Sequence, residues 1–266
     1  MAVIALASFS GAPGVTTTAL AMTFAWHRPA LLVEVDTAKT SSILPGSLRG
    51  QFGRDRGLTA LAIAQQNNAL TAAEVMEQRI ELAPDRSVIL GLSSIVAAQS
   101  TTALWSELGA TLSTLDSAGM DVILDVGRVS VRDPRSSLLQ IADSVQVLLR
   151  PTLPDIYTTA AQLTELRDLL AQAGHREYLE LLLVDTPLET WPRADIVKLT
   201  NVDVSAEIVH DPRSAAVYYA GAEPSRKLTR NSYTRSITTA ADLIRARILK
   251  RQELIGARPT RQETLG

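Results

Sequence analysis

Short aliphatic runs alternate with longer stretches of helical period along most of the chain. Most of these runs are apolar at nearly every position, which is typical of β-strands that helices cover on both faces of a sheet. Seven runs predict strands, at residues 3–9, 30–35, 87–92, 121–126, 144–149, 179–184 and 206–209. The first run lacks the basic residues of a secretion signal and leads into a loop of Gly, Pro and Thr, so we expect a strand there and not a signal peptide.

The stretches between these runs carry apolar residues at three- and four-residue spacing, which predicts helices. We expect helices from about residue 16 and at 58–66, 103–118, 155–173 and 237–254. Repeated strand–helix alternation predicts an α/β protein with a single doubly wound, mainly parallel sheet of about seven strands and helices on both faces. We expect one domain over residues 1–255 and a flexible polar tail over 256–266.

A turn with two glycines follows the first predicted strand and opens a helix. Gly11 and Gly14 permit a tight turn whose backbone N–H groups, together with the helix dipole, favour an anion. Thr16 or Thr17 would place a hydroxyl where phosphate-binding loops hold Mg²⁺. The alternative is structural: the turn itself needs the glycines, and the threonines only cap the helix.

The same segment resembles the deviant Walker A motif of ParA/MinD ATPases, K-G-G-x-G-K-T-[TS]. In this alignment Ser10 replaces the signature lysine and Val15 replaces the P-loop lysine. No lysine lies between residues 1 and 36, so a shift of one residue restores neither. The resemblance implies a P-loop NTPase fold, ATP or ADP with Mg²⁺ as ligands, and a homodimer.

Further landmarks follow in the order of that family over residues 2–250. Asp36 resembles the aspartate that orients the attacking water, and Asp125 resembles the Walker B aspartate that contacts Mg²⁺ through water. The segments 142–151, 183–185 and 208–213 resemble the family's next strand, its adenine-side pair and its late I-P-x-D segment. As an alternative, each aspartate only caps the turn after its strand.

One branch of the family resembles the chain more than the others do. The sequence V-I-L-D-V-G-R at 122–128 is similar to the V-x-x-D-L-P-R of the CpaE/TadZ branch, some of whose members also have a degenerate P-loop lysine. Those proteins help to place pilus assembly machines. The resemblance therefore implies a positioning factor for a pilus or secretion-type assembly.

Loss of both lysines changes the expected activity. One charge-assisted hydrogen bond contributes roughly 1.5–3 kcal/mol, so its absence weakens nucleotide binding about 10- to 150-fold. Hydrolysis should suffer more, because phosphoryl transfer depends on positioning and on stabilisation of charge. We therefore expect very weak or absent ATPase activity. Arg128, Arg150 and Lys39 are candidate substitute cations; alternatively they pair with surface carboxylates.

Composition narrows the function classes. Aromatic residues make up only 4% of the chain, which disfavours a nucleic-acid binder that stacks bases on aromatic side chains. The chain contains no cysteine, which excludes disulfides, thiolate catalysis and Cys-ligated metals. No apolar run approaches the length of a membrane span. His27, His175 and His210 lack metal-ligand spacing. We expect a cytoplasmic protein, with peripheral membrane association as an alternative.

The net charge of −2 hides an asymmetry. Residues 226–266 contain 10 Lys and Arg against 3 Asp and Glu, whereas residues 1–225 contain 16 against 25. The amphipathic pattern at 237–254 predicts a basic helix that contacts DNA, an acidic membrane or an acidic partner. Alternatively it is a solvated terminal helix, and the family resemblance implies that it packs on the sheet as the last helix.

Four functions remain open at this point. The first is a pseudo-ATPase that positions a pilus or secretion-type assembly through partner proteins. The second is a partition-type DNA-binding ATPase with an unusual loop, and the third is a MinD-like membrane-associated regulator. The fourth, a metabolic enzyme of the same fold, lacks a recognisable set of acid, base and nucleophile.

Overall fold

A β-sheet of eight strands forms the centre of the computed structural model, which describes residues 1–256 except 54, 95–101, 116–118, 131 and 227. The spatial order is β3-β4-β2-β5-β1-β6-β7-β8. Its strands are β1 (Val3–Ser8), β2 (Ala30–Glu34), β3 (Ile80–Ala83), β4 (Arg86–Ile89), β5 (Asp121–Arg128), β6 (Ser144–Leu149), β7 (Leu179–Val184) and β8 (Val204–Ile208). Neighbours pair in parallel except β3 and β4, which pair antiparallel.

The predicted α/β class and mainly parallel sheet are confirmed, while the expected strand count was one too low. The missed strand is β3, an edge strand of four residues with only Ile80 buried. Its half-exposed sequence lacks the continuous apolar run that marks the inner strands. A tight turn at Asp85, with φ of 61°, leads back into β4.

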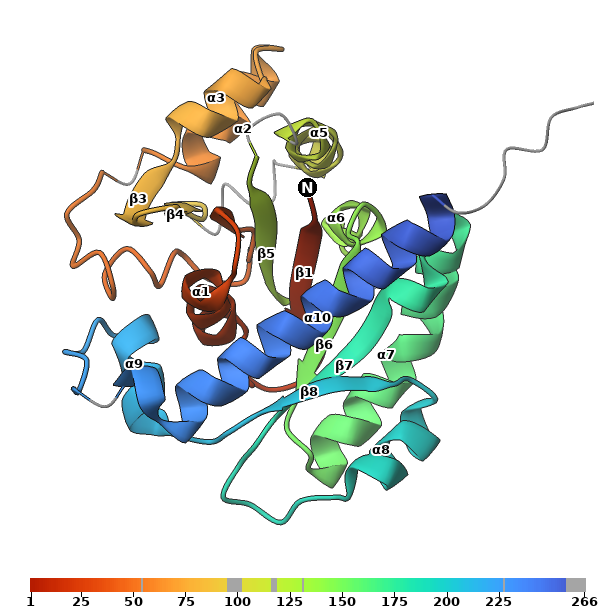
Figure 1. Cartoon of the computed structure of the whole chain (residues 1–266). Coiled ribbons are helices and arrows are strands. Elements are labelled where there is room, and N and C mark those ends of the chain that lie inside the picture. Colours follow the sequence, from red (N-terminus) through yellow and green to blue (C-terminus); the bar gives the residue numbers. More distant parts are fainter. Residues whose placement is uncertain (54, 95–101, 116–118, 131, 227, 257–266) are drawn as a thin grey trace, which may run out of the picture.

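Helices cover both faces of the sheet (Figure 1). One face is covered by α1 (Val15–Ala25), α9 (Pro212–Tyr219) and α10 (Ser232–Gly256). The other is covered by α2 (Leu58–Gln66), α3 (Ala72–Glu77), α5 (Thr102–Ser113), α6 (Ser136–Gln140), α7 (Leu153–Gln172) and α8 (Arg193–Thr200). All five predicted helices are present. The described helix α5 ends at Ser113, and residues 116–118 of the range predicted for it lie outside the described residues. The missed helices have five to eight residues, too short for a periodic pattern.

Strand side chains alternate between two apolar layers. In β1, Ile4 and Leu6 pack toward α1 and α10, while Val3, Ala5 and Ala7 pack toward the opposite helices. Because both layers are apolar, the strand needs hydrophobic residues at every position, and this explains its continuous aliphatic sequence.

The last helix, α10, runs across the face that α1 also covers (Figure 1). Its apolar stripe is buried in the core and consists of Ile237, Ala240, Ala241, Ile244 and Ile248. Arg247 forms an ion pair with Glu180 of β7, and the Arg251 guanidinium lies 4.7 Å from the centre of the Tyr178 ring. The implied role as a sheet-packing helix is confirmed. Its main apolar face is therefore not available to a lipid surface.

In the described part of the chain, no helix combines the length and apolar character needed to cross a bilayer. The predicted polar tail lies outside the described residues from 257 onward. Because β1, β2, β5, β6, β7 and β8 are parallel, their carboxyl ends meet at one edge of the sheet. The predicted site residues follow these ends, except Asp125 and Arg128, which lie in the last four residues of β5.

Candidate functional site

The loop between β1 and α1 has the backbone shape of an anion cradle. Gly11 and Gly14 adopt left-handed conformations, with φ of 49° and 91°. Gly14 precedes the first turn of α1, and no side chain caps the N–H groups there. These donors point from the start of a helix, where the dipole favours negative charge. A Cβ at Gly11 would lie 2.6 Å from Nη2 of Arg150, so a side chain would collide with the guanidinium.

Neither position that corresponds to a family lysine supplies a charge. Ser10 is buried, and its hydroxyl has no hydrogen-bond partner among the described residues. Val15 is also buried, and its side chain belongs to the apolar layer between the sheet and α10. Thr16 is buried and Thr17 is half-buried. The loop therefore keeps its shape and its hydroxyls without the cations of the motif.

A cavity of about 300 Å³ opens beside this loop at the carboxyl edge of the sheet. Gly14 and Thr17 line it on one side, and Asp185, His210 and Asp211 line it from the ends of β7 and β8. Asp185 belongs to the segment that resembles the family's adenine-side pair, and His210 and Asp211 belong to the segment that resembles its late I-P-x-D sequence. The fold thus brings both ends of the predicted nucleotide site to one cavity.

Arg150 lies at this cavity and is also paired. Its Nε lies 2.7 Å from Oδ2 of Asp155, and its Nη2 lies 3.3 Å from Oδ1 of the same carboxylate. The alternative of a carboxylate partner is realised, although Asp155 is buried and not at the surface. The guanidinium also lies next to Gly11, and its role as a substitute cation stays a prediction. Arg128 differs: its side chain is exposed at the end of β5 and makes no ion pair with any described residue.

Lys39 reaches the loop from the segment after β2. Its Nζ donates a hydrogen bond of 2.8 Å to Oγ1 of Thr16 and one of 3.4 Å to Oγ of Ser42. The same nitrogen lies 4.0 Å from Oδ2 of Asp36. Of the three candidate cations, Lys39 is the one that touches the predicted magnesium ligand directly.

Asp36 is buried where β2 leads into that segment. Its Oδ1 accepts a 2.8 Å hydrogen bond from the backbone N–H of Ala38, so the carboxylate caps the turn. Its carboxylate also packs on Gly127, where φ is 63° and a Cβ would lie 2.2 Å from Oδ2. The turn-capping alternative is therefore realised, and the water-orienting role stays a prediction.

Asp125 is fully buried in β5. Neither carboxylate oxygen has a hydrogen-bond partner of good geometry among the described residues. Burial raises the pKa of this carboxyl to about 7; the nearby Thr16 hydroxyl opposes the shift in part, and the charge of Glu34 adds to it. Asp125 is thus poised between its neutral and ionised forms.

Glu34, which sequence reasoning missed, is a third buried carboxylate at this edge, beside Asp36 and Asp125. It accepts hydrogen bonds from the Ser41 hydroxyl and from the backbone N–H of Gly91. Burial raises its pKa, against the effect of the Ser41 hydrogen bond. A usable signal was present in the sequence: Glu34 is the one charged residue within the aliphatic run of β2.

Arg135, also missed, ties the ends of β2 and β5 together. The side chain is buried, and it donates to the backbone carbonyls of Val35, Val126 and Arg128 at 3.1, 2.6 and 2.8 Å. It also pairs with both carboxylate oxygens of Asp133. Nothing in the sequence distinguishes it from the other arginines near the end of β5.

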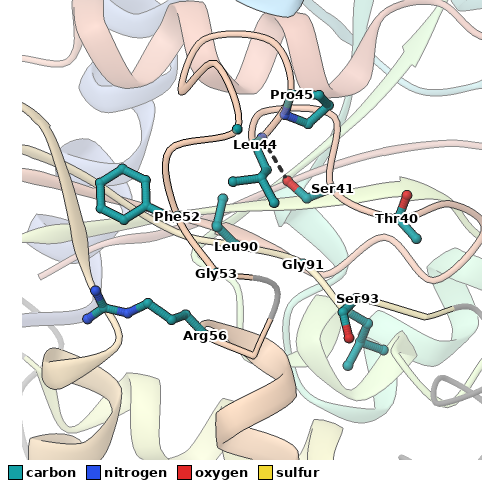
Figure 2. A pocket seen from close by; sticks show the side chains of 12 residues that line it. Thr40, Ser41, Leu44, Pro45, Phe52, Gly53, Arg56, Leu90, Gly91 and Ser93 are labelled. Carbon is teal, nitrogen blue, oxygen red and sulfur yellow. Dashed lines mark hydrogen bonds between the residues drawn. The ribbon is translucent and has the colours of Figure 1, made fainter.

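A smaller cavity of about 210 Å³ adjoins the segment after Lys39 (Figure 2). Figure 2 shows Phe52 and Arg56 on one side and Thr40 and Ser93 on the other. Ser41, which bonds Glu34, lines this cavity and accepts a 3.1 Å hydrogen bond from the Leu44 N–H. One short segment therefore separates this cavity from the residues around Thr16.

The residues predicted to bind Mg²⁺ do not fit the ion as they are placed. Thr16 Oγ1 already accepts a hydrogen bond from the Lys39 ammonium, which would repel a divalent cation at the same oxygen. Within the described ranges, no group of three or more acidic or histidine side chains is arranged to hold a metal ion. Magnesium would require Lys39 to move.

The fold as a whole is that of MinD and ParA proteins. A ParA-family ATPase from Chlorobium tepidum is similar with a TM-score of 0.70 and 14% identity, over 90% of this chain and 97% of that chain. The septum site-determining protein MinD from Pyrococcus horikoshii, solved with Mg-ADP, gives 0.68 and 14% over 96% and 97%. MinD from Aquifex aeolicus, in a complex with MinC, gives 0.60 and 12% over 98% and 99%. The sequence matches no protein-family model and no curated protein.

Proposed function

We propose that this chain is a ParA/MinD-like positioning or scaffolding factor that hydrolyses ATP weakly or not at all. The observation that carries the proposal is the loop, in which Ser10 and Val15 are buried and uncharged where the motif has lysines. A retained backbone cradle binds phosphate through N–H groups. Without the cationic clamp it provides little stabilisation of the transition state.

We also propose what the chain assembles with: the proteins of a pilus or secretion-type machine, and a second copy of itself. The similarity of residues 122–128 to the CpaE/TadZ branch supports a role in a cytoplasmic complex that places a pilus or secretion-type machine. The site would lie at the interface of a homodimer, as the family resemblance implies. Robust ATP turnover by the purified chain, abolished by Asp36→Asn, would overturn the proposal.

Restoring the P-loop lysine should recover nucleotide affinity. We expect Val15→Lys to tighten ADP binding by about 10- to 150-fold, because one charge-assisted hydrogen bond to phosphate is regained. Isothermal titration calorimetry of the native chain and the variant measures this directly. Val15→Met is the matched control, since it is long and uncharged, and we expect it to leave ADP affinity within about threefold of native, less than one charge-assisted bond contributes. Equal affinities for Val15→Lys and Val15→Met would show that charge at this position is not what the cradle lacks.

The alternatives centred on residues 226–266 have less support. Two of the basic residues of α10 turn inward: Arg247 pairs with Glu180, and Arg251 donates to the carbonyl of Asp143 at 2.8 Å. A partition-type role would require DNA binding that falls steeply with added salt. A MinD-like role would require binding to acidic vesicles that depends on this region.

A further inference from the structure

We propose that the ammonium of Lys39 takes the place of Mg²⁺, so that the loop binds the phosphates of a nucleoside di- or triphosphate in their metal-free form. The inference rests on the proposed function, in which the cradle survives without ATP turnover. To that function it adds two points: the nucleotide binds without its metal ion, and Lys39 recognises its phosphates.

The position of Lys39 is the first argument. Its Nζ contacts Thr16 Oγ1 at 2.8 Å, at the start of α1 where the uncapped N–H groups of the cradle gather. The lysine does not come from the loop itself, as the motif lysines do, but from the segment after β2. The loop therefore has a cation beside it that comes from another part of the chain, the segment after β2.

The charges around Lys39 are the second argument. Its Nζ lies 4.0 Å from Oδ2 of Asp36, and its charge also acts on Asp125 and Glu34. An acidic environment of this kind holds a cation in place, and here the cation is part of the chain. A divalent ion at Thr16 would meet the ammonium at close range and would be repelled.

Unsatisfied polar groups at the same place are the third argument. The Ser10 hydroxyl and both oxygens of Asp125 are buried and lack hydrogen-bond partners among the described residues. Buried polar groups without partners are uncommon and indicate a missing ligand or water. The Ser10 hydroxyl belongs to the loop and can donate a hydrogen bond to a phosphate oxygen, so it marks the cradle. The Asp125 oxygens, close to Thr16, are acceptors and would need a donor such as a water molecule.

The geometry of an ammonium allows it to serve phosphate as well. Lysine carries three N–H donors, of which two are directed to Thr16 and Ser42. Its side chain is 44% exposed, so an anion can approach from solvent. A phosphate bound there would contact the third donor and the N–H groups at the start of α1.

Calorimetric titration of the full chain with ADP and ATP, in excess EDTA and in excess Mg²⁺, tests the inference. We expect the native chain to bind at least as tightly in EDTA as in Mg²⁺. Lys39→Gln should weaken binding in EDTA about tenfold or more. It should also make the remaining binding tighter with Mg²⁺ than without, because the ion can then reach Thr16. Lys198→Gln, at an exposed lysine of α8, is the matched control and should change neither affinity.

Three results would overturn the inference: tenfold tighter binding of native protein with Mg²⁺, equal affinities for Lys39→Gln and Lys198→Gln, or no nucleotide binding in either buffer. The last two leave the proposed function intact, because a positioning factor need not bind nucleotide. Steady ATP turnover, measured in the same samples by phosphate release, contradicts the proposed function instead. The two failures are thus distinguishable.

Discussion

Replacement of Arg135 by methionine is expected to lower the free energy of unfolding by about 3–5 kcal/mol. The guanidinium is only 2% exposed and donates to three backbone carbonyls as well as to Asp133. The methionine side chain fills much of the volume but donates nothing, so the buried carbonyls of Val35 and Val126 would lose this donor. The Asp133 carboxylate would lose its guanidinium partner and keep only the hydrogen bond from the backbone N–H of residue 135. Buried polar groups left without partners lower the free energy of unfolding by more than the intact network raises it.

Urea unfolding, followed by the fluorescence of the buried Trp26 and Trp105, measures this effect. Arg132→Met is the matched control, because Arg132 is exposed and a surface change should stay within about 0.5 kcal/mol. The double variant Arg135→Met with Asp133→Leu should be less unstable than the two single losses added together, since neither charge is then left unpaired. A loss below about 1 kcal/mol for Arg135→Met would mean that the strand ends are held by other contacts.

This network also matters for the candidate site. Asp36 follows β2 and Asp125 lies in β5, and Arg135 is the side chain that joins the carboxyl ends of these two strands. Its Nη1 lies 3.9 Å from Oδ1 of Asp36. We therefore attribute the close placement of the acidic residues around Lys39 in part to Arg135. Among the predicted site residues, it contacts Asp36 and the backbone carbonyl of Arg128.

The fold could be predicted because its central strands are covered on both faces. Each such strand must be apolar throughout, and this pattern survives at 14% identity to proteins of the same fold. The edge strand β3 was not predicted because only Ile80 is buried in it, while Glu81 is exposed and the other two residues are half-buried. Helices of five to eight residues were not predicted, because so short a segment shows too little of the helical period.

The candidate site could be predicted only where it follows a local motif. The glycines of the loop can be recognised in the sequence, since a tight turn before a helix favours glycine. The hydrogen bond from Lys39 to Thr16 joins residues 23 positions apart, and Arg135 contacts Val35 across 100 positions. Such contacts depend on how loops meet at the sheet edge, which no local pattern encodes. The sequence therefore predicts the phosphate-binding loop, but it does not decide which of Lys39, Arg128 and Arg150 replaces the missing lysines.

Replacement of Asp125 by asparagine should make the stability of the protein less sensitive to a rise in pH from acidic to neutral. Burial raises the pKa of Asp125 from 3.8 to about 7, so between these values the folded chain keeps a proton that the unfolded chain releases. The stability of the native protein should therefore fall as pH rises through this window, by about 1.4 kcal/mol per pH unit. Asparagine is neutral and of nearly the same shape, so its variant lacks this dependence.

Urea unfolding at pH 5 and pH 8 tests the expectation. Relative to Asp125→Asn, the native protein should lose about 3 kcal/mol of unfolding free energy between the two pH values. Asp168→Asn, at an exposed aspartate of α7, is the matched control and should follow the native protein. If the difference between native and Asp125→Asn does not change with pH, Asp125 stays ionised throughout. The nearby Lys39 would then be its counter-ion, because it is the positive charge that lowers the pKa of this carboxyl.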